Sequence, residues 1–327
     1  MILALHRYSS ATQIAQQLRN LGLDVRESVP LRDLTRFQIG GEISVLAEAH
    51  EEAVFLRAAR AVADMRVPWL VQGAGTNLIG SDDGFDGVVL RYTGARMEKR
   101  EHSVYVEAGA ELQRLVDFTI SEGLSGLHTM TGIPGWVGGA IYGNAGAYGN
   151  AIAASIEGVR FYDGRVLRGI DCSGCEFGYR DSIFKRNKDW IILSATLSMH
   201  PGDADAMKHR ANEIRSLRDA KYPPSMRCAG SIFKNLLITV LPPSVTEELP
   251  PGVVIEGKLP AGWLLEQVGA KGLRRGDIQV ASYHANTVYN DGIGTSADLC
   301  ALIADLKSRV AARFGITLEE EVQFVGF

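Results

Sequence analysis

An arginine set among aromatic residues is the first group in this sequence that could hold a charged substrate. It is Arg180, within residues 177–184 (FGYRDSIF). A guanidinium group matches a carboxylate with two parallel hydrogen bonds, so the segment is a candidate anion clamp. The alternative is a surface ion pair between Arg180 and its neighbour Asp181, and the segment alone is compatible with both.

Two further segments hold a candidate proton donor and a pair of carboxylates. Ser231 follows a glycine and precedes Lys234 in CAGSIFKN, where it could move a proton, although such a serine is more often a turn residue. In residues 318–322 (LEEEV), Glu319 and Glu321 would share one face of a strand. The alternative for the glutamates is a solvated acidic cluster.

A glycine-rich loop is expected directly after a strand at residues 67–71. The loop comprises residues 73–80 (GAGTNLIG). Glycines directly after a strand leave backbone N–H groups free to point at an anion, as in phosphate-binding loops. It is not a Walker A loop, because it lacks Gly-Lys-Ser/Thr, and Leu78 stands where the dinucleotide fingerprint has its third glycine. By itself the loop is equally compatible with a plain tight turn.

A second glycine-rich run, residues 128–149 (HTMTGIPGWVGGAIYGNAGAYG), is apolar and aromatic rather than a solvated linker. Glycine costs roughly 0.5–1 kcal/mol relative to alanine inside a helix or strand, so we expect neither element here. Glycine is useful where the backbone lies close against something else. Two interpretations are open: a tightly packed buried segment, or a wall laid flat against a large ligand.

Hydrophobic periodicity and turn signals place these segments on an α/β framework with a mixed central sheet. Helices are predicted at residues 11–21, 51–65, 111–122, 203–221, 261–268 and 296–314. Strands are predicted at residues 43–49, 67–71, 88–92, 104–108, 190–199, 278–282 and 322–325, with a hairpin over 156–170 that turns at 163–164. Residues 236–260 are rich in proline and are expected to form a loop.

The composition is that of an ordinary folded protein of two or three compact units, with 327 residues, 46% of them hydrophobic, and a net charge of −4. Weak acidity gives no electrostatic reason to expect nucleic acid or a membrane surface as partner, and no apolar run approaches the ~20 residues of a membrane span. In MILALHRYSS the apolar patch precedes Arg7, the reverse of a signal peptide, so we expect a cytosolic protein.

Cys172 and Cys175 form a C-x-x-C motif, but Cys228 and Cys300 stand apart in the sequence. We therefore expect the pair to be structural or incidental, and we expect no metal site.

Taken together, these segments resemble the UDP-N-acetylenolpyruvoylglucosamine reductase (MurB) family. The resemblance runs over residues 29–326, and several ordered motifs are more specific than any single one. The motifs are TRFQIGG at 35–41, GAGTNLIGSDDGFDGVVL at 73–90, GIPGWVGGAIYGNAGAYG at 132–149, FGYRDSIFK at 177–185, GSIFKN at 230–235, AGWLLEQVGAKG at 261–272 and LEEEVQFVG at 318–326.

The resemblance implies an α+β architecture with the FAD-binding fold of the vanillyl-alcohol oxidase and p-cresol methylhydroxylase type. That fold consists of two α/β subdomains, and a C-terminal α+β substrate-binding domain follows it. We therefore expect FAD-binding subdomain 1 at residues 1–66, to which 318–327 can add a closing strand. Subdomain 2 is expected at 67–200 and the substrate-binding domain at 201–327.

The implied activity is that of a UDP-N-acetylmuramate dehydrogenase. NADPH reduces non-covalently bound FAD, and the flavin then reduces the enolpyruvyl ether of the UDP-sugar to UDP-N-acetylmuramate. This oxidoreductase step belongs to peptidoglycan synthesis, and so to cell-wall biogenesis, cell shape and cell division, in the bacterial cytoplasm. The implied partners are small molecules, and we expect a monomer.

Three residues match the catalytic positions of the family. Arg180 would hold the substrate carboxylate and stabilise the negative charge that develops there during hydride transfer. Glu321, in the family's L-E-x-E-V, would assist as a protonated hydrogen-bond donor. Ser231, in G-S-x-F-K-N, would protonate the adjacent carbon, because even a weak acid can protonate a strongly basic carbanion.

The cofactor and substrate positions follow from the same motif match. The FAD pyrophosphate is expected at Gly73, Ala74, Gly75, Thr76, Asn77 and Leu78, its adenine and ribityl parts at Thr131, Gly132, Ile133, Pro134, Gly135, Gly138, Gly139 and Ala140, and the flavin near Arg218. The expected substrate-binding residues are Tyr179, Lys221, Asn235, Lys271 and His284. For His284 a packed histidine at the end of a strand is the alternative.

The sequence departs from the family pattern in the insert at residues 236–260, so the uridine-side pocket can differ. The short stretch between 184 and 221 lacks room for the Tyr-bearing loop of one subclass, which favours the shorter, type II-like class. The competing functions are another oxidoreductase of this fold with covalent flavin, and a non-catalytic nucleotide-binding protein. The first loop has no His or Cys for a covalent link, and a binding protein would not need Arg180, Ser231 and Glu321 together.

Overall fold

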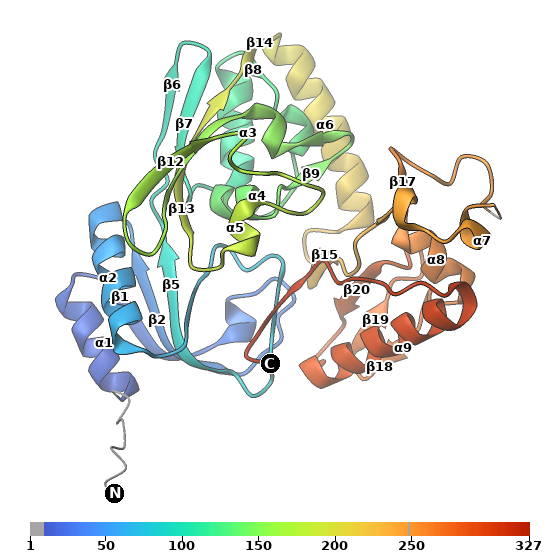
Figure 1. Cartoon of the computed structure of the whole chain (residues 1–327), viewed down its shortest axis with the longest axis horizontal. Helices are drawn as coiled ribbons and strands as arrows, with labels where there is room; N and C mark the ends of the chain where they lie inside the picture. Colours follow the sequence, from blue (N-terminus) through green and yellow to red (C-terminus); the bar gives the residue numbers. More distant parts are fainter. Residues whose placement is uncertain (1–9, 248) are drawn as a thin grey trace, which may run out of the picture. The chain divides into compact units, whose positions relative to one another are not determined.

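The structure, a computed structural model, describes residues 10–247 and 249–327 and divides into two compact units. The first unit comprises the chain up to Val29, Ile43–Ala74 and Asp86–Arg218, and the second comprises Pro30–Glu42, Gly75–Phe85 and Asp219–Phe327 (Figure 1). The expectation drawn from the first residues, including Arg7, lies outside the described residues. The three-part division at residues 66 and 200 remains a prediction.

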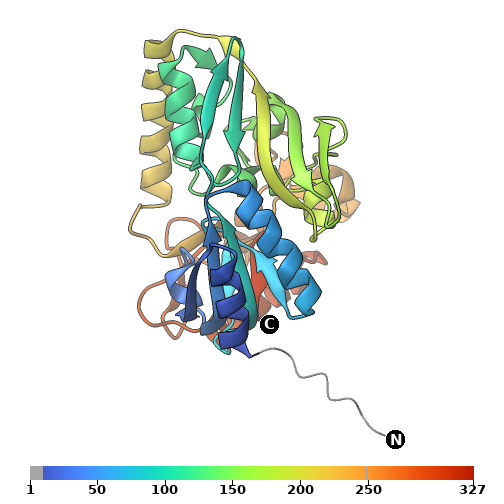
Figure 2. The ribbon, with the colours of Figure 1, turned by 90° about the vertical axis from the view of Figure 1, so that its left-hand side faces the viewer.

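One sheet of the first unit has the strand order β1-β2-β5-β3, and two helices pack on it (Figures 1 and 2). The strands are β1 (Asp24–Pro30), β2 (Glu42–Ala49), β5 (Phe85–Tyr92) and β3 (Trp69–Val71), and the helices are α1 (Ala11–Asn20) and α2 (Glu52–Met65). A capping box at Ser10 and Gln13 begins α1, and α2 ends at Arg66 in the left-handed conformation. Strand β1, rich in charged residues, was not predicted.

The second sheet of this unit is antiparallel throughout, with the order β12-β11-β13-β7-β6. Its strands are β6 (Met97–Arg100), β7 (Ser103–Glu107), β11 (Ile156–Tyr162), β12 (Leu167–Asp171) and β13 (Ile191–Ser198). Helices α3 (Leu112–Ser121) and α6 (Ala204–Lys221) lie on one face (Figure 2). The predicted hairpin over 156–170 is confirmed. The strands predicted for one mixed sheet are divided between two sheets: β3 and β5 pair in parallel in the first, whereas β7, β11, β12 and β13 belong to this antiparallel one.

The second glycine-rich run contains a helix, α4 (Val137–Tyr142), so the expectation of no regular element there is wrong. Tertiary contacts offset the glycine cost: Val137 and Ile141 are fully buried, and the N–H groups of Val137 and Gly138 donate to the carbonyls of Ala110 and Ala108, both at 2.8 Å. Burying a branched aliphatic side chain is worth about 1.5–3 kcal/mol, more than one helical glycine costs.

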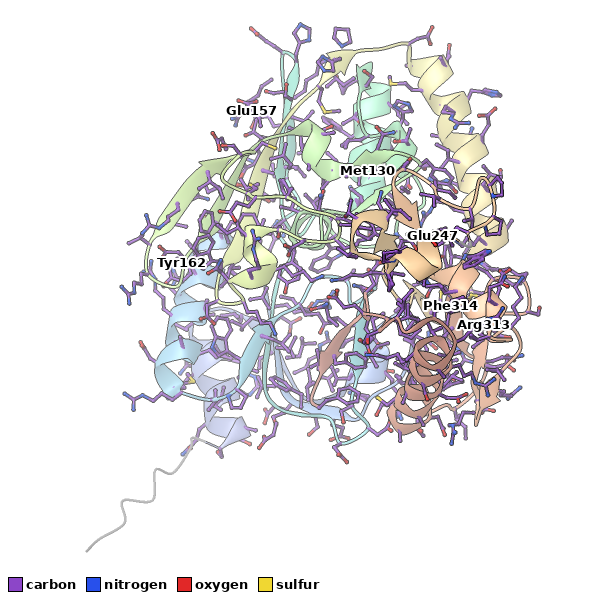
Figure 3. The ribbon with its side chains drawn as sticks, turned by 45° about the vertical axis from the view of Figure 1, so that its right-hand side comes forward. Met130, Glu157, Tyr162, Glu247, Arg313 and Phe314 are labelled. Atoms are coloured by element: carbon purple, nitrogen blue, oxygen red, sulfur yellow. The ribbon has the colours of Figure 1, made fainter. Side chains whose placement is uncertain are left out.

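The second unit has a four-stranded sheet of order β15-β20-β19-β18. It comprises β15 (Cys228–Ser231), β18 (Arg274–Arg275), β19 (Ile278–Val280) and β20 (Thr287–Asn290), with α8 (Ala261–Gln267) and α9 (Ser296–Phe314) in the same unit. Helix α9 has the predicted bounds, because a Thr295–Asp298 capping box begins it and left-handed Gly315 ends it. Figure 3 shows Arg313 and Phe314 at its end, where the Phe314 ring lies 6.0 Å from that of Trp263.

The closing strand β21 (Gln323–Val325) pairs in parallel with β4 (Leu78–Gly80). The proline-rich region expected as a loop contains the strand pair β16 (Leu236–Leu237) and β17 (Lys258–Leu259) and the short helix α7 (Pro243–Thr246). The remaining short elements are β8 (Leu124–Ser125), β9 (Gly146–Ala147), β10 (Asn150–Ala151), β14 (His200–Pro201), α5 (Ile183–Arg186), and the 3-10 turns Leu31–Asp33, His128–Met130, Ile152–Ser155 and Ile238–Val240. Within residues 10–247 and 249–327, no helix has both the length and the apolar character needed to cross a membrane.

The four cysteines are all free thiols. Burial raises the pKa of the Cys175 thiol to about 12, so the group is protonated at neutral pH. A buried, protonated thiol is unreactive, which supports the structural interpretation of the C-x-x-C pair.

Candidate active site

The loop that carries Arg180 is held by the second half of the glycine-rich run, within the first unit. The Asn144 amide donates to the Gly178 carbonyl at 2.8 Å, the Ser182 hydroxyl donates to the Tyr142 carbonyl at 2.7 Å, and the Arg180 guanidinium donates to the Gly146 carbonyl at 3.1 Å. These bonds fix the loop at both ends. Sequence reasoning missed Asn144, because its partner lies far along the chain.

Arg180 adopts a left-handed backbone conformation, with φ of 54°. A non-glycine residue in this region is strained, and such strain persists only where the surroundings hold it. Its guanidinium carbon lies 5.4 Å from the centre of the Tyr179 ring, while Asp181 forms an ion pair with Arg186 at 3.4 Å. The carboxylate beside Arg180 in sequence is therefore engaged with a different arginine.

Ser231 and Glu321 lie on adjoining extended segments of the second unit. The Glu321 N–H donates to the Ile232 carbonyl at 2.7 Å, and the Lys234 N–H donates to the Glu319 carbonyl at 2.9 Å. These bonds place the backbone of Glu321 beside that of Ile232, the residue after Ser231. The neighbouring glutamates are used otherwise, since Glu320 pairs with Lys307 at 2.9 Å and Glu319 pairs with Lys234.

Asn286 fixes the strand that carries Ser231. It is buried, with 2% of its surface exposed, and its amide donates to the Phe233 carbonyl at 2.8 Å while its carbonyl oxygen accepts from the Phe233 N–H at 2.9 Å. A side chain that satisfies both backbone groups of a buried residue acts as a clamp. The sequence offered no signal for it.

We expect Asn286→Ala to lower the free energy of unfolding by about 2–4 kcal/mol, because it leaves two buried backbone groups of Phe233 without partners. Urea unfolding followed by circular dichroism measures the change. The matched control is Asn150→Ala, at an exposed asparagine with one long bond to the Tyr148 carbonyl, which should change stability by less than about 0.5 kcal/mol. Equal stabilities for the two variants would contradict the clamp.

The first glycine-rich loop crosses the boundary between the two units, with Gly73 and Ala74 in the first and Gly75 to Leu78 in the second. In the second unit, the Asn77 amide donates to the Glu321 carbonyl at 3.0 Å, and the Arg36 N–H donates to the Gly75 carbonyl at 3.2 Å. The side chain of Asn77 thus supports the segment of the candidate glutamate.

The second glycine-rich loop is attached to the start of α3. The Gln113 carbonyl oxygen accepts from the Gly132 N–H at 2.7 Å and from the Thr131 hydroxyl at 3.2 Å. Gly132 has φ of 73°, and a Cβ there would lie 3.2 Å from Cδ of Arg218. The structure therefore brings Arg218 against this loop, and Gln113 is a supporting residue that sequence reasoning missed.

The glycines of this run serve different purposes. A Cβ at Gly138 would lie 3.0 Å from that of Ala108, and one at Gly146 would lie 2.5 Å from the Asn150 carbonyl oxygen, so both are needed for packing. Gly139 differs: it is exposed, and a Cβ there would meet nothing within 4 Å. Packing within the chain therefore explains why Gly138 and Gly146 are glycines, but it does not explain Gly139.

The expected substrate residues lie mainly in the second unit. Asn235 accepts a hydrogen bond from the Ala261 N–H at 3.2 Å and so caps α8, and Lys271 pairs with Glu266 at 2.9 Å. Burial, reinforced by nearby Lys221, lowers the pKa of His284 to about 4, so its ring is neutral at pH 7. A neutral imidazole can donate one hydrogen bond and accept another, but it adds no positive charge.

The predicted residues are thus divided between the units. The first unit holds Tyr179, Arg180, Arg218, Gly73, Ala74 and the positions from Thr131 to Ala140, and the second holds Gly75 to Leu78, Lys221, Ser231, Asn235, Lys271, His284 and Glu321. Within the units, the structure brings the segment of Ser231 close to that of Glu321, and Arg218 close to Gly132.

Comparison with known proteins identifies the family to which the chain belongs. Residues 222–325 match the domain described as UDP-N-acetylenolpyruvoylglucosamine reductase, C-terminal domain, and residues 43–168 match an FAD binding domain. The UDP-N-acetylenolpyruvoylglucosamine reductase of Solibacter usitatus is 53% identical over 304 residues, which cover 93% of this chain and 97% of the relative. The chain belongs to the UDP-N-acetylenolpyruvoylglucosamine reductase family.

Further reductases of this family extend the match. The one from Rubrobacter xylanophilus is 37% identical over 91% of this chain and 94% of its own length. The crystal structure of the Thermus caldophilus reductase (MurB) aligns with a TM-score of 0.73 at 29% identity, covering 93% of this chain and 99% of that one. The predicted family and the predicted fold class, an α+β chain with an FAD-binding domain and a reductase C-terminal domain, are confirmed.

The residues of the first unit fit the cofactor that the FAD-binding domain implies. Gly139 is exposed and has open space where a Cβ would lie, so its backbone is accessible to a flat ligand. The guanidinium of Arg218 beside Gly132 supplies positive charge to the same glycine-rich run. A positive charge beside an open stretch of backbone is the kind of surroundings that suits an anionic cofactor.

Proposed function

We propose that this chain reduces UDP-N-acetylenolpyruvoylglucosamine to UDP-N-acetylmuramate, with non-covalent FAD as cofactor and NADPH as reductant. The observation that carries the proposal is the 53% identity to a reductase of that name over 93% of the chain. The hydrogen bond from the Glu321 N–H to the carbonyl of Ile232, the residue after Ser231, supports it, because this bond places the two candidate residues on neighbouring segments.

The chain's own residues account for the charge and the proton of this reaction. FAD, when bound, supplies a hydride to the enolpyruvyl group. Arg180, presented by a loop that Asn144 and Ser182 hold, would bind the substrate carboxylate and stabilise its growing negative charge. Ser231 would donate its proton to the neighbouring carbon, and Glu321 would donate a hydrogen bond to the same carboxylate.

The remaining assignments complete the proposal. The two glycine-rich loops and Arg218 would hold FAD, and Tyr179, Lys221, Asn235, Lys271 and His284 would bind the sugar nucleotide. Two FAD-binding subdomains, at residues 1–66 and 67–200, would precede the substrate-binding domain at 201–327. We further propose that the protein acts as a monomer in the bacterial cytoplasm, where precursors of peptidoglycan are made.

The experiment that tests the function is an anaerobic half-reaction. The purified protein should show a flavin absorbance band, which NADPH bleaches and the enolpyruvyl sugar nucleotide restores. If the reduced flavin is not reoxidised by this substrate, the protein is not the reductase. If the flavin cannot be released by denaturation, the covalent-flavin oxidoreductase becomes the better assignment.

Gly139→Ala separates the two interpretations of the glycine-rich run. Because Gly139 is helical and a Cβ there meets nothing within 4 Å, alanine should stabilise the apoprotein by about 0.5–1 kcal/mol. If FAD lies against this backbone, the added methyl group should cost about 1–3 kcal/mol of binding, a ~5–150-fold rise in Kd measured by flavin fluorescence.

The control for this substitution is Gly169→Ala in β12, where a Cβ is equally unobstructed and the backbone is also exposed. It should leave the Kd for FAD unchanged. An unchanged Kd for both variants would mean that the run serves packing alone.

A further inference from the structure

A second hydroxyl group lies against the candidate proton donor. Oη of Tyr222 is 3.1 Å from Oγ of Ser231, and both residues are half-buried in the second unit. We propose that Tyr222 is a positioning residue that orients Ser231 and relays a proton from solvent to it. This inference rests on the proposed reduction of the enolpyruvyl ether.

The backbone around Tyr222 is fixed on both sides. The hydroxyl of Tyr283 donates to the Lys221 carbonyl at 2.9 Å, and the Pro223 carbonyl accepts from the Met226 N–H at 2.8 Å. Because a proline follows it, Tyr222 is itself restricted to extended conformations. The phenol therefore reaches Ser231 from a held position rather than from a mobile turn.

The chemistry of the two hydroxyls sets the direction of the hydrogen bond. A phenol is a stronger acid than an aliphatic alcohol, so Tyr222 is the better donor and Ser231 the better acceptor. In that arrangement the Ser231 proton points away from Tyr222 and is available to the substrate. The opposite arrangement would direct the same proton at the phenol oxygen and away from the reaction.

The proton transfers balance as follows. The Ser231 O–H bond breaks as its proton forms a C–H bond with the substrate carbanion, and in the same step the Tyr222 O–H bond breaks as its proton reforms the Ser231 hydroxyl. The negative charge thus moves from the carbanion to the phenolate oxygen of Tyr222, and solvent water reprotonates the phenolate before the next turnover. The ammonium group of Lys221, 5.1 Å from the ring centre, favours the transient negative charge on Tyr222.

The first test is Tyr222→Phe in the anaerobic half-reactions of the FAD-loaded enzyme. Flavin reduction by NADPH should change less than twofold, whereas flavin reoxidation by the enolpyruvyl substrate should slow by ~10–100-fold, within the range for a positioned proton-transfer group. The matched control is Tyr289→Phe, whose hydroxyl bonds to Gln279 at 3.0 Å, and it should retain the wild-type rate.

A double-mutant cycle separates the relay from a merely structural role. Because Tyr222 acts through Ser231, Tyr222→Phe should have no further effect on reoxidation in a Ser231→Ala background. Additive losses would overturn the relay. Reoxidation rates in mixtures of H2O and D2O give an independent readout: we expect a curved dependence on deuterium content in the wild type and a linear one in Tyr222→Phe, and a linear dependence or none in the wild type would also overturn it.

These outcomes are distinct from a failure of the proposed function. If wild-type reduced flavin does not react with the enolpyruvyl sugar nucleotide, the function itself is wrong. If the wild type reacts and Tyr222→Phe reacts equally fast, the function stands and Tyr222 has no part in the proton transfer.

Discussion

Ser231→Ala is expected to slow reoxidation of the reduced flavin by the enolpyruvyl substrate by ~10²–10⁴-fold, the range for removal of a general acid. Reduction of the flavin by NADPH should change less than twofold, because that step needs no proton at the substrate carbon. Stopped-flow absorbance of the flavin under anaerobic conditions measures both rates in one preparation.

The structure indicates that Ser231→Ala removes the hydroxyl without disturbing the strand that carries it. Ser231 is the last residue of β15, and the backbone of the next residues is held by Asn286 rather than by the serine hydroxyl. Alanine should therefore leave the strand in place. Ser121→Ala, at an exposed helical serine bonded to the Phe118 carbonyl, is the control and should match the wild type. Equal losses in both half-reactions would show that Ser231 is not a specific proton donor.

Elements with strong local signals were predictable from the sequence. Helix α9 combines an apolar stripe with a capping box and a terminal glycine, and its predicted bounds, residues 296–314, are those of the structure. The helix α4 was not predictable, because hydrogen bonds from Val137 and Gly138 to carbonyls elsewhere in the chain outweigh the low helix propensity of glycine. Helix propensity depends on the local sequence, whereas those hydrogen bonds join residues that are far apart in the sequence.

The same reasoning explains which site residues could be found. Arg180, Ser231 and Glu321 stand in compact motifs that a resemblance can recognise. Their supports are not in those motifs: the Asn144 amide bonds to a residue 34 positions away, and the Asn286 amide to one 53 positions away. Such partners are defined only by the folded chain, so residue type and spacing cannot reveal them.

Arg180→Lys is expected to lower the rate of reoxidation of the reduced flavin by ~10²–10³-fold, comparable with the loss of one donor from a site that stabilises developing negative charge. Lysine keeps the positive charge but cannot form two parallel hydrogen bonds to a carboxylate. Because the guanidinium would bind the reacting carboxylate more strongly as its charge grows, the turnover number should fall more than the KM rises.

The backbone at this position makes the substitution a test of the side chain. Arg180 has φ of 54°, and this left-handed conformation is as unfavourable for lysine as for arginine. The backbone strain therefore does not change with the substitution. The substitution affects the bond from the Arg180 side chain to the Gly146 carbonyl, but the bonds from Asn144 and Ser182 that also hold the loop remain. Arg186→Lys, in the same segment and paired with Glu176 at 2.7 Å, removes an exposed guanidinium and should keep the wild-type rate. If Arg180→Lys also keeps that rate, a single positive charge is sufficient and the two-bond clamp is wrong; if both variants lose activity equally, the effect belongs to the loop rather than to Arg180.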